Sequence, residues 1–102
     1  MSMDKVNRSE RTIRISDDVL RQVAAISAAD VPGVASAETP VKITNLGGAV
    51  SAEVRILVKP GSRAAAVASR VQKTVKQSIQ DMTGVTAVHV HVEISGMQET
   101  EV

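Results

Sequence analysis

Residues 63–95 read RAAAVASRVQKTVKQSIQDMTGVTAVHVHVEIS, and the spacing of their apolar side chains changes at Thr83-Gly84. Before this point, apolar residues recur every fourth position, as on one face of a helix, at Val67, Val71, Val75 and Ile79. After it, apolar and polar residues alternate from Val88 to Ser95, as in a strand with one buried face. The stretch therefore predicts a helix that ends at Thr83-Gly84 and a strand that follows it.

The residues before this stretch predict a strand and a helix. Residues 12–15 alternate and predict a short strand, and Ser16 is a plausible N-cap because two aspartates follow it. The helix is expected to run to about Ala29, since Pro32-Gly33 prevents its continuation. Its predicted buried side consists of Val19, Leu20, Val23, Ala24 and Ile26.

A hairpin is predicted at Gly47-Gly48, where two glycines allow the positive φ angles of a tight turn. Its strands are residues 34–46 and 50–58. With the turn at the glycines, Ile43 faces Ala52 and Lys42 faces Glu53, which matches apolar to apolar and cation to anion.

The order strand, helix, strand, strand, helix, strand predicts an α+β fold. We expect a two-layer sandwich, with two helices on one face of a mostly antiparallel four-stranded sheet in a ferredoxin-like arrangement. Ser62 is the predicted N-cap of the second helix. The expected organisation is a disordered arm over residues 1–10, a single domain over residues 11–96 and a short flexible tail over residues 97–102.

Composition narrows the function classes. The chain has 102 residues, with 12 Lys and Arg against 11 Asp and Glu, and it has no Cys, Phe, Tyr or Trp. This excludes disulfides, thiolate chemistry and base stacking on aromatic side chains, and no strong steering toward nucleic acid is expected. No apolar run approaches the roughly 20 residues of a transmembrane helix, so we expect a cytoplasmic location. No serine, histidine and carboxylate are arranged as a catalytic group, so we expect neither an enzyme nor a cofactor.

Two groups of residues are candidate sites. His89, His91 and Glu93 share one strand face and would bind a metal ion if a neighbouring strand supplied another ligand; the alternative is a solvated face. The two histidines would also respond to pH near neutrality. Candidate partner-binding residues are Glu53, Arg55 and Leu57 of the third strand, His89 and His91, and a basic stripe of Arg70, Lys73 and Lys76.

Further features have two interpretations each. The basic stripe suits phosphates or anionic lipid, but glutamines dilute it, which favours a solvated helix face. Residues 59–63 (KPGSR) would hold an anion at a helix N-terminus or simply form a turn. The last strand, residues 86–95, would pair with another copy if it lies at a sheet edge; otherwise it is covered or internal.

Residues 15–34, 67–85 and 88–92 together carry a resemblance to a known family. They include a helix that ends in Val-Pro-Gly-Val and the passage from Val-Gln-x-x-Val-Lys to Met-Thr-Gly-Val, and they resemble the alkaline-shock-protein family of bacterial envelope stress response proteins. The resemblance implies a non-enzymatic cytoplasmic protein that self-associates, gathers at the membrane through a small membrane-anchored partner and supports envelope homeostasis. Family members often carry longer charged extensions than residues 97–102. The alternatives are a nucleic-acid-binding module and a small-ligand or metal-binding regulatory domain.

Overall fold

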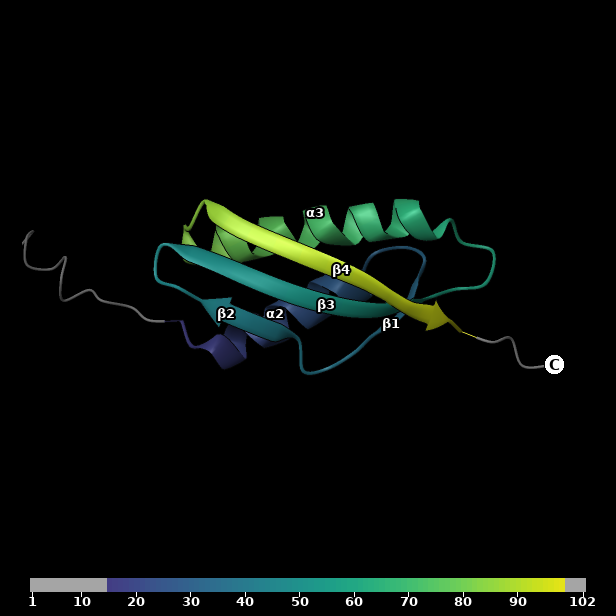
Figure 1. Cartoon of the computed structure of the whole chain (residues 1–102), viewed down its shortest axis with the longest axis horizontal. Coiled ribbons are helices and arrows are strands. Elements are labelled where there is room, and N and C mark those ends of the chain that lie inside the picture. The colour runs from purple at the N-terminus through teal and green to yellow at the C-terminus, as the bar shows by residue number, and fades with distance from the viewer. Residues whose placement is uncertain (1–14, 99–102) are drawn as a thin grey trace, which may run out of the picture.

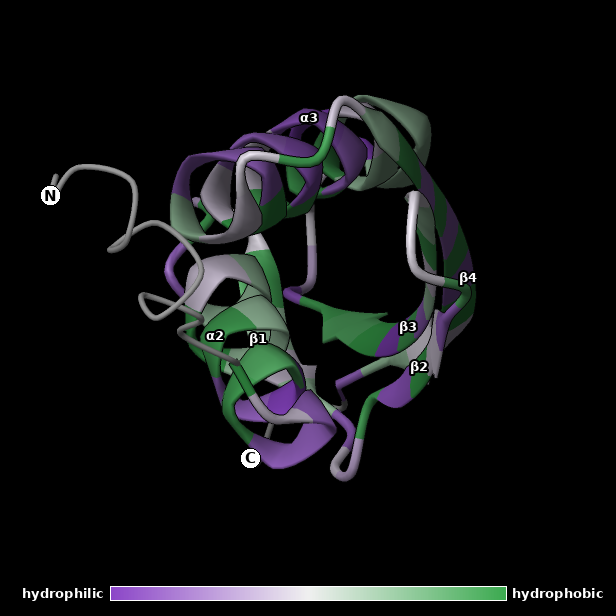
Figure 2. Cartoon of the chain, turned by 90° about the vertical axis from the view of Figure 1, so that its left-hand side faces the viewer, coloured by the Kyte–Doolittle hydropathy of each residue, from purple (hydrophilic) through white to green (hydrophobic). Residues whose placement is uncertain are grey.

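The computed structural model describes residues 15–98, in which two helices and four strands form two layers (Figure 1). Residues 1–14 and 99–102 lie outside the described part, and with them fall the predicted arm, most of the predicted first strand and most of the predicted tail. The elements are α2 (Asp17–Ala29), β1 (Val34–Ala37), β2 (Lys42–Asn45), β3 (Ala49–Val58), α3 (Ala64–Thr83) and β4 (Ala87–Met97). Both helices cover the same face of the sheet (Figure 2), so the predicted α+β sandwich is confirmed.

The central strand of the sheet is β3. Along one edge it pairs antiparallel with β1 near its end and with β2 near its start, and along the other it pairs parallel with β4. Two of these three pairings are antiparallel, which confirms the mostly antiparallel sheet. The predicted single strand over residues 34–46 is wrong, because residues 38–41 separate β1 from β2. Pro40 lies in this break and has no N–H group to donate to a ladder.

The β2–β3 hairpin has the predicted register, with Lys42 opposite Glu53 and Ile43 opposite Ala52. Gly47 has a φ of 86°, and its N–H group donates to Oδ1 of Asn45 over 3.1 Å. The turn therefore forms where the glycines predict it, and the side chains of β3 alternate between the buried and the exposed face of the sheet.

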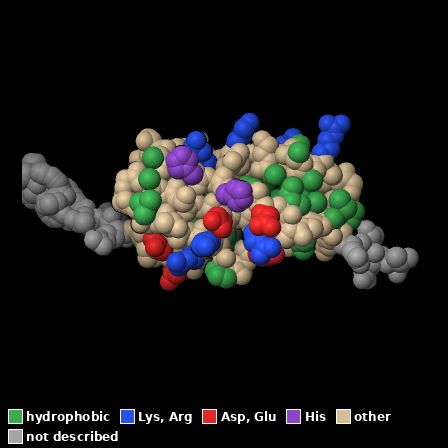
Figure 3. Space-filling view, in the orientation of Figure 1, with side chains coloured by type: hydrophobic (Ala, Val, Ile, Leu, Met, Phe, Trp, Pro, Cys, Tyr) green, Lys and Arg blue, Asp and Glu red, His purple; other side chains and the backbone are tan. Residues whose placement is uncertain are grey.

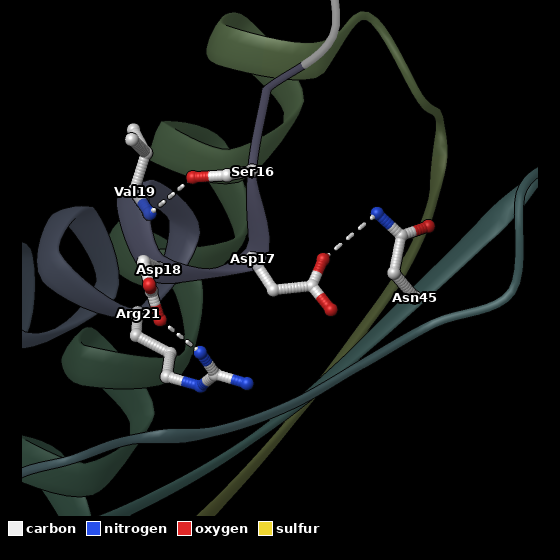
Figure 4. Close-up of polar contacts among 6 residues, drawn as sticks. All are labelled: Ser16, Asp17, Asp18, Val19, Arg21 and Asn45. Carbon is white, nitrogen blue, oxygen red and sulfur yellow. Dashed lines mark hydrogen bonds and ion pairs between the residues drawn. The ribbon is translucent and has the colours of Figure 1, made fainter.

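The N-terminus of α2 is capped as predicted, because Oγ of Ser16 accepts a hydrogen bond from the Val19 N–H group over 3.3 Å (Figure 4). Asp17 also accepts a 3.5 Å hydrogen bond from Asn45, which ties the helix start to the end of β2. The predicted buried side is wrong in part: Val19 is 40% and Ile26 63% exposed.

The buried residues of α2 are Leu20, Ala24 and Ala28. They form a narrow stripe, two of whose members are alanines, and small side chains let neighbouring elements approach closely. The helix contacts α3 and also β1, β2 and β3 of the sheet. This packing leaves Val19 and Ile26 at the surface and Val23 half-buried.

The apolar stripe of α3 is buried as predicted, at Val67, Val71, Val75 and Ile79. The helix ends at Gly84, whose φ of 75° is left-handed, so the predicted end is also confirmed. The predicted N-cap at Ser62 is wrong, because Arg63 occupies that position and makes no side-chain cap. The Ser62 N–H group instead closes a turn with the Lys59 carbonyl over 3.1 Å.

Candidate functional site

The sheet face opposite the helices has no second layer among residues 15–98 (Figure 2). We call this surface the open face. It carries the outward side chains of three strands, which are Lys42, Thr44, Ser51, Glu53, Arg55, Leu57, His89, His91 and Glu93. Figure 3 shows the two histidines on it beside acidic and basic side chains.

Arg55 lies at the centre of the open face between two carboxylates. Its Nε is 3.4 Å from Oε1 of Glu93 on β4, and its Nη1 is 3.6 Å from Oε1 of Glu38, which follows β1. All three side chains are about half exposed, so each pair contributes at most about 1 kcal/mol. The arrangement places Arg55 in contact with both edges of the sheet and gives the open face mixed charge.

The histidines lie in register with polar residues of β3. His89 is opposite Ser51, His91 is opposite Glu53, and Glu93 is opposite Arg55. Within residues 15–98, no group of three or more His, Asp or Glu side chains is placed to hold a metal ion. The structure thus places the candidate ligands His89, His91 and Glu93 along one strand face but does not bring them together as a site.

The basic stripe of Arg70, Lys73 and Lys76 is exposed on α3. Lys73, Lys76 and Gln72 also line a groove of about 320 Å³ against β4, whose other wall is formed by Val88, His89 and Val90. The stripe therefore meets the histidine row at β4, and two sets of predicted partner-binding residues are neighbours. Residues 59–63 form a turn closed by the hydrogen bond from Ser62 to Lys59, and nothing in the described residues marks this turn as an anion site.

A second groove lies beside α2 and was not predicted from the sequence. It has a volume of about 630 Å³, and Ala25, Ile26 and Pro40 supply much of its apolar wall. The helix has apolar residues on more of its circumference than one narrow contact can bury, and this excess was the available signal.

No helix in residues 15–98 combines the length and the apolar character that crossing a bilayer requires.

Solved structures of similar fold include the MamM CTD. A copper form has a TM-score of 0.60 and 22% sequence identity, and the match covers 81% of this chain and 87% of that chain. A manganese form of a variant has a TM-score of 0.53 and 18% identity, with 78% and 99% of the two chains covered. At these identities the likeness concerns the fold alone.

No curated protein sequence matches this one significantly. A profile of the alkaline shock protein 23 family, described as having a cell envelope-related function, matches residues 37–99. The match spans more than half of the 102 residues and includes the open face and most of the core. The resemblance seen in the sequence is thereby confirmed, and the protein belongs to the alkaline shock protein 23 family.

Proposed function

We propose that this protein is a non-enzymatic scaffold of cell-envelope homeostasis, which self-associates and is held at the inner face of the cell membrane by a small membrane-anchored protein. The family supplies the envelope-related function. The observation that carries the rest is the open face, a broad sheet surface that no helix of residues 15–98 covers.

The charge pattern of the open face favours a protein partner. Lys42 and Arg55 are interspersed with Glu38, Glu53 and Glu93, and Leu57 adds a half-buried apolar side chain. A nucleic acid or an anionic bilayer is bound mainly by Lys and Arg, whereas a surface of both signs selects a partner with the complementary pattern. The open face therefore suits a folded or extended polypeptide better than a polyanion.

Indirect membrane attachment follows from the weakness of the direct alternatives. Arg70, Lys73 and Lys76 would each contribute about 1 kcal/mol near an anionic surface, and the chain has no aromatic side chain to anchor a helix in the interface. The apolar stripe of α3 is buried in the core, so it is not available for insertion. A separate anchored protein supplies the missing affinity in this proposal.

The proposal is tested by affinity capture of the tagged full chain from membranes of its native cell. Wild type is expected to recover a small membrane protein, and Arg55→Glu is expected to lose it, since this change makes the centre of the open face uniformly acidic. Lys73→Glu is the matched control, because it reverses one exposed charge on α3 and is expected to retain the partner. Circular dichroism checks that both variants are folded.

Two results would contradict the proposal. One is the absence of any membrane protein in the wild-type capture, and the other is equal recovery by wild type and Arg55→Glu. Salt-dependent retention on RNA or DNA would favour the nucleic-acid-binding alternative, and stoichiometric metal in the purified protein would favour the metal-binding one.

A further inference from the structure

β4 is an edge strand, since in residues 15–98 it pairs with β3 alone. Successive residues of a strand direct their N–H and C=O groups to opposite edges. The Ile56 carbonyl accepts a hydrogen bond from the Ser95 hydroxyl of β4, and the Val58 carbonyl accepts one from the Gln98 N–H group. The carbonyl of Arg55 accepts one from the Glu38 N–H group on the other side. The even-numbered residues of β3 therefore direct their N–H and C=O groups toward β4.

This orientation of the β3 backbone determines which N–H and C=O groups of β4 remain unpaired with β3. In a parallel pair, the residue directly opposite an inward-facing residue turns its backbone groups away. Val90 is opposite Ala52 and Val92 is opposite Val54. Val88, Val90, Val92 and Ile94 consequently present their N–H and C=O groups to the free edge, whereas His89, His91 and Glu93 direct theirs to β3.

Glutamines of α3 cover the first half of this edge. Nε2 of Gln72 donates to the Val90 carbonyl over 2.8 Å, and Nε2 of Gln80 donates to the Thr86 carbonyl over 3.0 Å. The Val88 N–H group is also satisfied, by the Thr86 carbonyl at 3.0 Å. Covering an edge in this way discourages pairing with another strand.

Within residues 15–98, α3 offers no amide to the second half of the edge, and the irregularity in the pairing with β3 lies beyond Ile94. The two glutamines are about 12 Å apart along the helix, which matches the roughly 13 Å from Thr86 to Val90 along the strand. By the same spacing, the residue of α3 expected level with Val92 is Ala68, one helical turn before Gln72, and its methyl group cannot donate to a carbonyl.

Apolar exposure coincides with the open backbone groups. Val92 is half-buried, Ile94 is 36% exposed and Met97 is 52% exposed. Figure 3 shows hydrophobic side chains gathered toward the C-terminal end of β4. This segment therefore offers both a ladder and an apolar contact to an added strand.

We propose that the second half of β4 pairs antiparallel with the same segment of a second copy, in the register that places Val92 opposite Val92 of that copy. This inference rests on the self-association in the proposed function and assigns a surface to it. The register sets Val90 against Ile94 of the second copy on the helix side. On the open face it sets His91 against Glu93 of the second copy, twice by symmetry.

Three neighbouring registers are less favourable. A shift that centres the pairing on Glu93 places two carboxylates directly opposite each other, which is repulsive. A shift that centres it on Val90 or His91 moves the ladder into the half covered by Gln72 and Gln80. The Val92 register has one conflict of its own, since the Val90 carbonyl must exchange Gln72 for Ile94 of the second copy. The hydrogen bond from Gln72 to the Val90 carbonyl therefore competes with the pairing and weakens it without preventing it.

The test is sedimentation velocity of the full chain over a wide concentration range. Wild type is expected to form a dimer, and Ile94→Pro is expected to remain folded but monomeric, because the N–H group it removes points to the free edge. Ile94→Lys is a second variant with the same expected loss of dimer. His91→Pro is the matched control for the direction of the N–H group. The N–H group of His91 points to β3, so its loss is expected to lower thermal stability far more than Ile94→Pro does.

Removal of the Gln72 amide tests this competition, because it is expected to strengthen the dimer. Gln72→Met keeps the size of the side chain without its amide, and it is expected to lower the dimer dissociation constant by about tenfold, because two capping hydrogen bonds per dimer no longer compete. Gln77→Met is the matched control, since Gln77 bonds to Asp81 on the exposed side of α3 over 2.8 Å and leaves β4 untouched.

A wild type that is monomeric at every concentration would overturn the inference, and so would a dimer that survives both Ile94→Pro and Ile94→Lys. In the second case self-association stands and only the surface is wrong. Capture of a membrane protein by Ile94→Lys would show that partner recruitment is independent of this pairing. A weaker dimer in Gln72→Met would also contradict the inference.

Discussion

Replacement of Gly33 by alanine is expected to destabilise the domain severely, because Gly33 is constrained both by its backbone angles and by its neighbours. Its φ is 97°, and an added Cβ would lie 2.5 Å from Cγ2 of Val67 and 3.4 Å from Oγ of Ser62. Val67 is buried in the core, and the Gly33 carbonyl accepts a 2.8 Å hydrogen bond from the Lys59 N–H group. The turn between α2 and β1 therefore cannot move away from α3 without breaking other contacts.

The expected cost has two parts. A left-handed backbone angle costs a residue with a Cβ roughly 1–2 kcal/mol, and forcing a methyl group into a packed core costs about 1–3 kcal/mol more. Domains of this kind have total stabilities of about 5–15 kcal/mol, so Gly33→Ala removes a large fraction. Each kcal/mol lowers Tm by roughly 4–8 °C for a domain of this size.

Gly47→Ala separates the two parts. Gly47 has a φ of 86°, but no atom lies within 4 Å of its added Cβ, so only the backbone cost is expected. Urea and thermal denaturation followed by circular dichroism would measure both variants. A double-mutant cycle of Gly33→Ala with Val67→Ala should show favourable coupling, because the second change removes the obstructing methyl group. If Gly33→Ala is no less stable than Gly47→Ala, the close approach of this turn to α3 is wrong.

Three further predictions address other parts of the molecule. Val71→Asp is expected to unfold the domain by burying an unpaired carboxylate, whereas Arg70→Asp is tolerated; equal thermal melts would contradict the assigned helix face. Ser16→Ala is expected to cost about 1 kcal/mol through loss of the α2 cap, and Ser62→Ala much less because Ser62 makes no cap; urea denaturation compares them. Purified protein is not expected to sediment with anionic vesicles at physiological salt; sedimentation that survives high salt would reveal an apolar insertion and refute indirect attachment.

Local patterns predicted those parts of the fold in which one periodicity accounts for all buried residues. The stripe of α3 from Val67 to Ile79 lies at a regular four-residue spacing, and the register of β2 and β3 follows from two glycines at a fixed position. Each feature is determined within about 20 residues, so no distant contact was needed to place it.

The errors arose where distant packing decided the outcome. Ile26 and Val19 are apolar and occur in a helix, but α2 buries only a narrow stripe against α3 and the sheet. The apolar pattern allowed several helix orientations, and the choice among them depended on elements far along the chain. The break between β1 and β2 was different, since Pro40 was a local signal that the strand prediction did not weigh.

The edge of β4 shows most clearly what a strand pattern omits. Alternation predicts which face of the sheet a side chain occupies, and it placed His91 and Glu93 correctly on the wet face. It does not predict which edge a backbone group faces, because that depends on the register with β3. A proline at His91 would therefore remove a hydrogen bond inside the sheet, although alternation marks His91 only as an exposed position.

The sequence of β4 contains no lysine or proline that would blunt this edge, and the irregularity in its pairing with β3 lies between Ile94 and Gly96, near its C-terminal end. The protection instead lies on another element: Gln72 and Gln80 of α3 reach the Val90 and Thr86 carbonyls from the side. In the sequence these glutamines only diluted a basic helix face. A helix that connects two parallel strands runs antiparallel to the last strand. Its side chains can therefore cap successive carbonyls of that strand, and this capping ends where α3 consists mainly of alanines. In the proposed dimer, the composition of α3 therefore determines how much of β4 a second copy can pair with.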